Sequence, residues 1–216
     1  MPMRIFALLL LARSAAALPC DTYAAAGTPC VGAFSLLRAL RADYGGPLYY
    51  VRRASDNTTV PIPLLAPGGF VNTSAQDQFC AGTSCAVWRI VDQSLYSNDL
   101  TPAPPGGSAR HVDNGVNASA LPVHLPDGSL GYGALFVHGA NQGYRIDITN
   151  GVAVFVPRGP RAAPRRPPPP PHTSLPPLCR SGNEAETIYM VTSGETYNPD
   201  CCLCVSQGPL ALAPPP

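Results

Sequence analysis

The chain has 216 residues, 45% of them hydrophobic, and a formal net charge of +1. This length is enough for one domain with a real core. The near-neutral charge argues against nucleic acid or an anionic membrane surface as a partner.

The first 17 residues have the pattern of a secretory signal peptide. Arg4 supplies a positive charge, residues 5–12 form an apolar run, and small residues at 15–17 give an A-x-A type of cleavage site. The run is too short for a comfortable membrane span. Three N-x-S/T sequons, at Asn57, Asn72 and Asn117, agree with secretion and predict glycosylation. We therefore expect a secreted, extracellular glycoprotein that is not attached to a membrane after signal cleavage.

Apolar residues at 33, 36, 37 and 40 follow helical spacing and stop before Gly45-Gly46, which predicts one short N-terminal helix. Residues 47–53 are aromatic and β-branched, and residues 59–62 return as a short strand after a turn at Asp56-Asn57. Pro61 and Pro63 cannot donate to a ladder, which favours an edge position for the second strand.

Residues 85–92 give the strongest strand pattern, with Val87, Arg89 and Val91 on one face and Trp88 and Ile90 on the other. Further strands are expected at 122–125, 133–137, 152–156 and 187–192, and Asp127-Gly128 is a hairpin signal between the first two of these. Many short strands separated by Gly/Pro turns predict an all-β sandwich.

A proline-rich segment at 157–178 interrupts this pattern, and residues 205–216 form a second, proline-rich tail. An unbroken proline run cannot join a sheet and is typical of solvated polyproline II. The segment fits a linker, a ligand for a proline-binding partner, or noncoding sequence translated in error. The expected domain organisation is a signal peptide (1–17), a sandwich (18–156), a disordered insertion (157–178), a continuation of the sandwich (179–204) and a disordered tail (205–216).

The eight cysteines, in a secreted chain, indicate disulfides. Cys20 and Cys30 would close a short loop, and Cys80 and Cys85 a tighter one. Cys201 and Cys202 are adjacent, so a bond between them would close a small, strained ring with a flat face of two sulfurs. Pairing of each with another cysteine is the equal alternative from spacing alone. A zinc site made of Cys201-Cys202-Leu203-Cys204 with His172 would lack the paired C-x2-C spacing of structural zinc sites, and we expect no metal and no cofactor.

No nucleophile elbow, phosphate loop or H-E-x-x-H helix is present. The four histidines are scattered, which favours surface or core roles: His111, His124, His138 and His172. A glycosidase needs two carboxylates facing the scissile bond, about 5–5.5 Å apart in a retaining enzyme. Spacing alone pairs none of the candidates, which are Asp92, Asp99, Glu184, Glu186, Glu195 and Asp200. Most should be turn formers or solvated charges.

Nine segments, taken in order, resemble fungal α-L-arabinofuranosidase B of glycoside hydrolase family 54. They lie between Pro19 and Val154 and between Asn183 and Cys202. They begin at 19–23, 27–33, 35–40, 46–49 and 74–80, continue at 92–94, 100–107 and 143–145, and end with Tyr197-Asn198-Pro199-Asp200-Cys201-Cys202. The collinear order is far more specific than any one segment.

The resemblance implies a concanavalin-like β-sandwich of the jelly-roll type, incomplete in this chain, and a secreted, monomeric, retaining hydrolase. Such an enzyme removes terminal arabinofuranosyl groups from arabinan or arabinoxylan, in L-arabinose metabolism. The implied partner is an arabinose-containing plant or algal polysaccharide. The family's disulfides correspond to Cys20–Cys30, Cys80–Cys85 and Cys201–Cys202, and the last pair implies a platform beneath the bound sugar.

The departures matter as much as the resemblance. After Cys202 the chain continues Leu203-Cys204-Val205-Ser206, where the family has a Phe-Asp-Tyr-Gly-Asn type of segment. No residue matches the family's catalytic Glu or Asp, which are expected beyond the end of this chain. We therefore expect no hydrolysis by the 216 residues alone. The alternatives are a non-catalytic secreted carbohydrate-binding protein and a degenerate chain that does not fold.

Overall fold

A computed structural model describes residues 17–105, 110–147, 150–151 and 189–192. These residues hold two short helices and seven strands, which confirms the all-β prediction. The helices are α1 (Pro19–Ala25) and α2 (Thr73–Phe79). The strands are β1 (Tyr49–Arg53), β2 (Thr59–Ile62), β3 (Cys85–Ile90), β4 (Thr101–Pro102), β5 (Leu121–His124), β6 (Leu130–Gly133) and β7 (Tyr144–Arg145).

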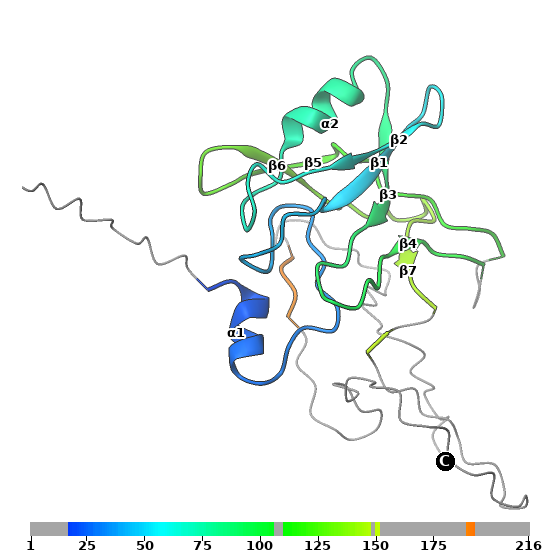
Figure 1. The fold of residues 1–216 in the computed structure, drawn as a ribbon. Coiled ribbons are helices and arrows are strands. Elements are labelled where there is room, and N and C mark those ends of the chain that lie inside the picture. The colour runs from blue at the N-terminus through cyan, green and yellow to red at the C-terminus, as the bar shows by residue number, and fades with distance from the viewer. Residues whose placement is uncertain (1–16, 106–109, 148–149, 152–188, 193–216) are drawn as a thin grey trace, which may run out of the picture.

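The strands form three small antiparallel sheets (Figure 1). The largest has the order β2-β1-β3, so β2 lies at its edge, as its prolines predicted. The second pairs β4 with β7, and the third is the hairpin β5-β6. Asp127-Gly128 turns this hairpin, and Gly128 has φ 82°, a conformation that glycine adopts without steric cost.

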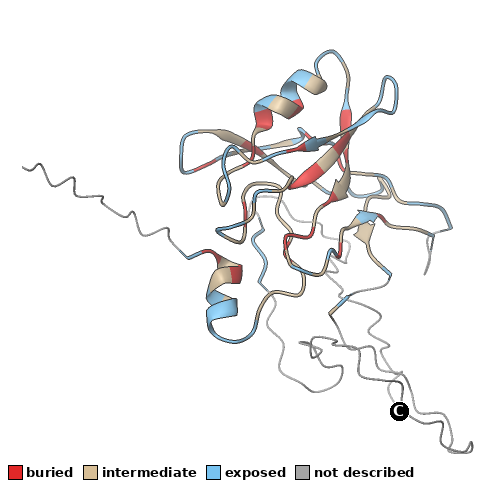
Figure 2. Cartoon of the chain, viewed as in Figure 1, coloured by how far each residue is buried: buried red, intermediate tan, exposed pale blue. Residues whose placement is uncertain are grey.

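The core lies on one face of the three-stranded sheet, where Figure 2 shows buried residues on β1 and β3. Leu48, Tyr49 and Val51 contribute from β1 and the residue before it, and Ile62 from β2. Helix α2 closes one end through Gln76, which is fully buried. Its Oε1 accepts a 2.8 Å hydrogen bond from the Tyr49 hydroxyl, and its Nε2 donates to the Ala118 carbonyl at 3.0 Å.

A β-bulge changes which side chains of β3 face the core. The pairing runs Tyr50 with Arg89 and then Val51 with Val87, so Trp88 is an extra residue on β3. Val87 and Ile90 are therefore both buried, whereas strict alternation predicted them on opposite faces. The expectation that Val87, Arg89 and Val91 share a face is wrong for this reason.

The predicted helix over residues 33–40 is also wrong, because the structure has no helix there. The Oγ of Ser35 accepts 3.2 Å hydrogen bonds from the N–H groups of Leu37 and Arg38, a local competitor of helix formation. Distant partners take other N–H groups of the segment: Ala39 donates to the Gly69 carbonyl at 2.9 Å. Tertiary hydrogen bonds thus replace the helical ones.

Two of the expected strands differ as well. Strand β6 ends at Gly133, and residues 134–137 form a loop in which the Val137 N–H donates to Gln142 Oε1 at 2.8 Å. Residues 189–192 are in no strand. The expected strand at 152–156, the proline-rich segment 157–178 and the tail 205–216 lie outside the described residues, and the domain boundaries stay predictions.

Candidate functional site

The adjacent cysteines Cys201 and Cys202 lie outside the described residues, and so do Glu184, Glu186, Glu195 and Asp200. Their proposed roles stay predictions. The structure does describe the candidate carboxylates Asp92 and Asp99, which follow β3, and a separate polar pocket at the opposite end of β3, where it pairs with the end of β1.

Asp92 is a structural carboxylate. Its side chain is 4% exposed and accepts four hydrogen bonds. Oδ1 receives the N–H groups of Ala33 (2.8 Å) and Ser94 (2.9 Å), and Oδ2 receives the Ser94 hydroxyl (2.6 Å) and the Asn98 N–H (2.9 Å). The carboxylate therefore fastens the N-terminal segment to the turn after β3 and has no lone pair left for a substrate.

Asp99 is committed in a similar way. Its Oδ1 accepts a 2.9 Å hydrogen bond from the Asp92 N–H, and its Oδ2 lies 3.2 Å from Arg89 Nε. Among the described carboxylates, all but Asp113 have a hydrogen bond or ion pair that fixes them; these are Asp21, Asp43, Asp56, Asp77, Asp92, Asp99, Asp127 and Asp147. The described part of the chain therefore offers no pair of uncommitted carboxylates for glycoside chemistry.

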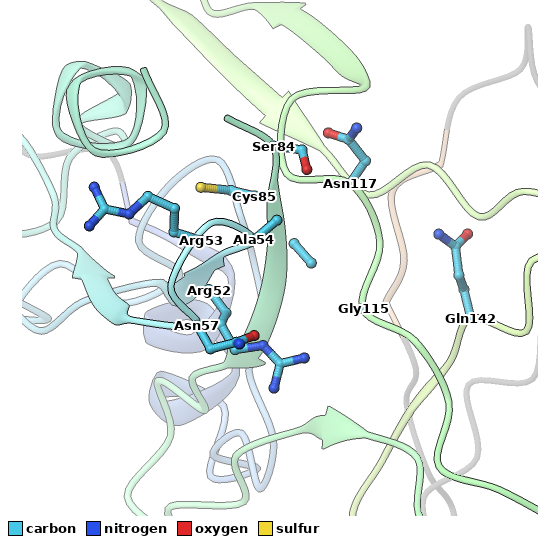
Figure 3. Close-up of a pocket in the computed structure, with 10 residues that line it drawn as sticks. Arg52, Arg53, Ala54, Asn57, Ser84, Cys85, Gly115, Asn117 and Gln142 are labelled. Atoms are coloured by element: carbon cyan, nitrogen blue, oxygen red, sulfur yellow. The ribbon is translucent and has the colours of Figure 1, made fainter. Parts of the chain in front are cut away.

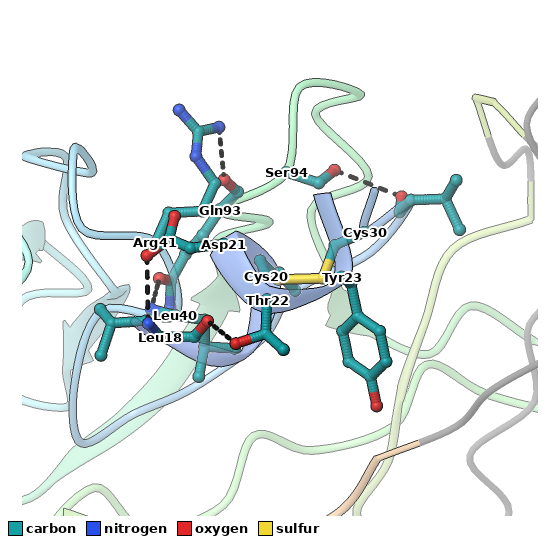
Figure 4. Close-up of a disulfide and its surroundings, with 12 residues drawn as sticks. Leu18, Cys20, Asp21, Thr22, Tyr23, Cys30, Leu40, Arg41, Gln93 and Ser94 are labelled. Carbon is teal, nitrogen blue, oxygen red and sulfur yellow. Dashed lines mark hydrogen bonds between the residues drawn. A yellow bond between two sulfur atoms is a disulfide. The ribbon is translucent and has the colours of Figure 1, made fainter. Parts of the chain in front are cut away.

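Two disulfides are present among the described residues, Cys20–Cys30 and Cys80–Cys85, with Cα–Cα distances of 5.5 and 5.9 Å. Both pairings agree with those that the family resemblance implied. Figure 4 shows Cys20–Cys30 joining α1 to the segment that follows it, beside Ser94, whose hydroxyl donates to the Val31 carbonyl at 3.2 Å. The disulfide closes the loop 20–30, and the hydrogen bond from Ser94 joins the residue after this loop to the turn that carries Asp92.

An open polar pocket of about 360 Å³ lies where the ends of β1 and β3 meet the segment 115–117 (Figure 3). It is lined by the sequence neighbours Arg52, Arg53 and Ala54, by Asn57, by Ser84, Cys85 and Ala86, and by Gly115, Asn117 and Gln142. No lining residue is a carboxylate. A Cβ on Gly115 would come within 2.2 Å of the Val87 carbonyl oxygen, so only glycine permits this close approach to β3.

Tyr144 fixes the same segment from behind. Its hydroxyl donates to the Val87 carbonyl at 2.7 Å and accepts from the Val116 N–H at 2.8 Å. Burial raises the pKa of the Tyr144 hydroxyl to about 12, so it stays protonated at neutral pH. The pocket floor is therefore held by neutral hydrogen bonds.

The sequons occupy different environments. Asn57 and Asn117 are exposed, on turns that reach the pocket from two directions, whereas Asn72 is half-buried and precedes the buried Thr73. The histidines at 111, 124 and 138 are exposed, and His172 lies outside the described residues. No group of three or more His, Cys, Asp or Glu that could hold a metal occurs in the described part of the chain.

Comparison with known proteins identifies the family. The sequence model described as "Alpha-L-arabinofuranosidase B, catalytic" matches residues 19–159. This chain belongs to that family. α-L-Arabinofuranosidase B of Emericella nidulans is 40% identical over 191 residues, and that of Aspergillus kawachii is 39% identical over 196.

Structural comparison agrees with this. A crystal structure of an arabinofuranosidase in complex with arabinofuranosyl-α-1,2-xylobiose has a TM-score of 0.59 and 44% identity, over 62% of this chain and 28% of that one. A glutamate-to-glutamine mutant of a family 54 α-L-arabinofuranosidase, soaked with 4-nitrophenyl α-L-arabinofuranoside, has a TM-score of 0.58. The matches to the two curated relatives cover 87% and 89% of this chain but 32% and 33% of theirs. The chain thus spans about a third of their length.

The pocket was not predicted from the sequence. Its residues come from four separate segments, and Arg52, Asn117 and Gln142 belong to no shared motif. The sequons at Asn57 and Asn117 marked two of its residues, but for a different reason. The bulged pairing of β1 with β3 and the bridges of Ala86 with Asn117 and of Asn114 with Gln142 bring these segments together.

Proposed function

We propose that this chain is the N-terminal part of a secreted, retaining α-L-arabinofuranosidase that hydrolyses terminal arabinofuranosyl groups of arabinan or arabinoxylan. The observation that carries the proposal is the family match over residues 19–159, together with 44% identity to an arabinofuranosidase crystallised with an arabinofuranosyl-xylobiose. The partner would be an arabinose-containing polysaccharide. The chain would act as a monomer.

The described carboxylates argue that the catalytic pair does not come from this part of the chain. Asp92 and Asp99 serve as hydrogen-bond acceptors in the fold. Asp113 therefore has no second free carboxylate among the described residues with which it could form a catalytic pair. We therefore expect the purified 216-residue protein not to hydrolyse 4-nitrophenyl α-L-arabinofuranoside. A steady release of nitrophenol that scales with protein concentration would contradict this expectation.

Because the described carboxylates other than Asp113 are held by hydrogen bonds or ion pairs within the fold, a second candidate function is also supported. This candidate is a carbohydrate-binding protein without hydrolytic activity. In this case Cys201 and Cys202 would form the sugar platform. Calorimetry with arabinose and arabinoxylan oligomers tests it: binding that is lost in Cys202→Ala supports the platform, and absence of binding by the wild type contradicts it.

Secretion and glycosylation belong to the same proposal. The apolar run at 5–12, the small residues at 15–17 and the three sequons support export after cleavage near residue 17. Among the described residues no helix is both long enough and apolar enough to cross a bilayer. Expression in a fungal host, followed by N-terminal sequencing and peptide mass spectrometry of the medium, tests cleavage and the occupancy of Asn57, Asn72 and Asn117. Retention of residues 1–17 in the exported protein would contradict the signal-peptide proposal.

A further inference from the structure

The polar pocket contains an arginine whose charge is neutralised by none of the described carboxylates. The guanidinium carbon of half-buried Arg52 lies 3.4 Å from the centroid of the Trp88 ring, and no carboxylate pairs with it in the described part of the chain. Arg53 next to it forms an ion pair with Asp56 at 2.6 Å, and Figure 3 shows its guanidinium turned away from that of Arg52. The pocket therefore has one cationic group available for a ligand.

Contact with Trp88 also fixes that guanidinium. A guanidinium held against an indole ring keeps its N–H donors directed outward in its own plane, where they match the two oxygens of a carboxylate. Arginine and carboxylate often form two parallel hydrogen bonds, which are stronger than neutral ones. Because the side chain is already restrained, less rotamer entropy is lost when a ligand binds.

The neighbouring amides add donors rather than acceptors. Asn117 Oδ1 accepts the Ser119 N–H at 2.9 Å, and Gln142 Oε1 accepts the Val137 N–H at 2.8 Å. Each amide oxygen thus already accepts one backbone N–H, while its NH2 group has no acceptor in the described part of the chain. With the Ser84 hydroxyl, these groups make a pocket that is rich in donors and free of carboxylates.

A ligand for this pocket must carry one carboxylate and several further oxygen acceptors. A volume of about 360 Å³ is at the small end of the range for ligand sites and suits a single ring rather than a long chain. We propose that the pocket binds a hexuronate unit of an acidic polysaccharide. Arg52 would hold the sugar carboxylate, and the amides of Asn117 and Gln142 would donate to ring and hydroxyl oxygens.

This site is independent of the proposed hydrolase function, since no catalytic carboxylate takes part. A glycan on Asn117 would use the same Nδ2 atom, so this proposal and glycosylation of Asn117 exclude each other, and a glycan found on Asn117 of the exported protein would overturn the proposal. Binding is to be tested on protein made in the bacterial periplasm. There the two described disulfides can form and no N-glycan of this kind is added.

The chain has one tryptophan, Trp88, and it contacts the proposed ligand-binding arginine. Fluorescence titration at constant ionic strength, with calorimetry as a second readout, would compare sodium D-glucuronate with D-glucose and with sodium acetate. We expect a saturable response to glucuronate, at least tenfold weaker binding of acetate, and no response to glucose. Arg52→Gln should weaken glucuronate binding at least tenfold. Arg52→Lys should weaken it too, because lysine lacks the planar fork.

Arg41→Gln is the matched control. It removes a positive charge that Asp43 neutralises and that lies outside the pocket, so glucuronate binding should be unchanged. The proposal is overturned if the wild type does not respond to glucuronate, if glucose or acetate binds as well as glucuronate, or if Arg52→Gln and Arg41→Gln weaken binding equally. The cooperative urea transition of each variant shows whether it is folded.

Discussion

Replacing Asp92 by alanine should destabilise the fold strongly, although the residue was a candidate for catalysis. The substitution leaves the N–H groups of Ala33 and Asn98 without acceptors, and these residues are only 3% and 1% exposed. A buried donor left unsatisfied costs about 1–3 kcal/mol. The two donors at about 2 kcal/mol each give an expected loss of about 4 kcal/mol. The Ser94 groups are half-buried and can reach water, so they add little.

Asp92→Asn separates the contributions of the two oxygens. One oxygen remains and can accept its two hydrogen bonds, while the new NH2 group faces two donors, of which one is a buried N–H, so the loss should be about 2 kcal/mol. Asp43→Ala is the control, because the Asp43 side chain is 73% exposed and its ion pair with Arg41 lies at the surface. An exposed pair contributes about 0–1 kcal/mol.

Urea denaturation followed by the emission of Trp88 gives the free energy of unfolding of each variant. The urea midpoint should be highest for Asp43→Ala, lower for Asp92→Asn and lowest for Asp92→Ala. The slope of the unfolding free energy against urea concentration should be the same for all three variants. A loss below about 1 kcal/mol for Asp92→Ala would refute the reasoning, because it would mean that the buried donors find other acceptors.

Three other predictions concern stability. The raised pKa of Tyr144, about 12 against 10.0 for an ordinary tyrosine, favours the folded state below pH 10, and this contribution should be lost as the pH rises from about 10 to 12. Thermal melts over this range should decline less steeply for Tyr144→Phe than for the wild type; parallel declines would contradict the assignment. Joint replacement of Cys20 and Cys30 by serine should cost about 2–3 kcal/mol, from the entropy of a loop of that size, and reduction of the wild type should cost more, because it also opens Cys80–Cys85. Gly115→Ala should cost about 1–3 kcal/mol by displacing a backbone segment from β3, whereas Gly45→Ala, whose Cβ would meet nothing closer than 3.7 Å, should change the melting temperature little. Equal effects of the two glycine substitutions would contradict the packing argument.

Local patterns predicted much of the strand content. The runs at 49–53 and 59–62 form the expected pair, Pro61 lies on the edge strand, and Asp127-Gly128 turns a hairpin. These features depend on neighbours in the sequence, such as β-branched side chains, a missing N–H or a glycine that accepts positive φ. The ordered set of motifs also identified the family before any comparison.

The absence of a helix at 33–40 and the set of β3 side chains that face the core could not be predicted in the same way. The apolar residues do have helical spacing, but the N–H groups of the segment donate to Ser35 and to distant acceptors at Gly69 and Asp92 instead of to helical carbonyl groups. At Trp88 a single bulge shifts the alternation of β3, and it becomes visible only in the register of β3 with its partner strand β1.

The sequence by itself determined the all-β class, the short disulfide loops, the edge position of β2 and the family, because each depends on residue types at short or collinear spacing. Only the tertiary structure decided that Asp92 accepts four hydrogen bonds and that Arg52, Asn117 and Gln142 share one pocket. The role of a carboxylate or an arginine depends on which groups from distant segments surround it. Those neighbours are brought together by strand pairing and burial, which no single stretch of the chain encodes.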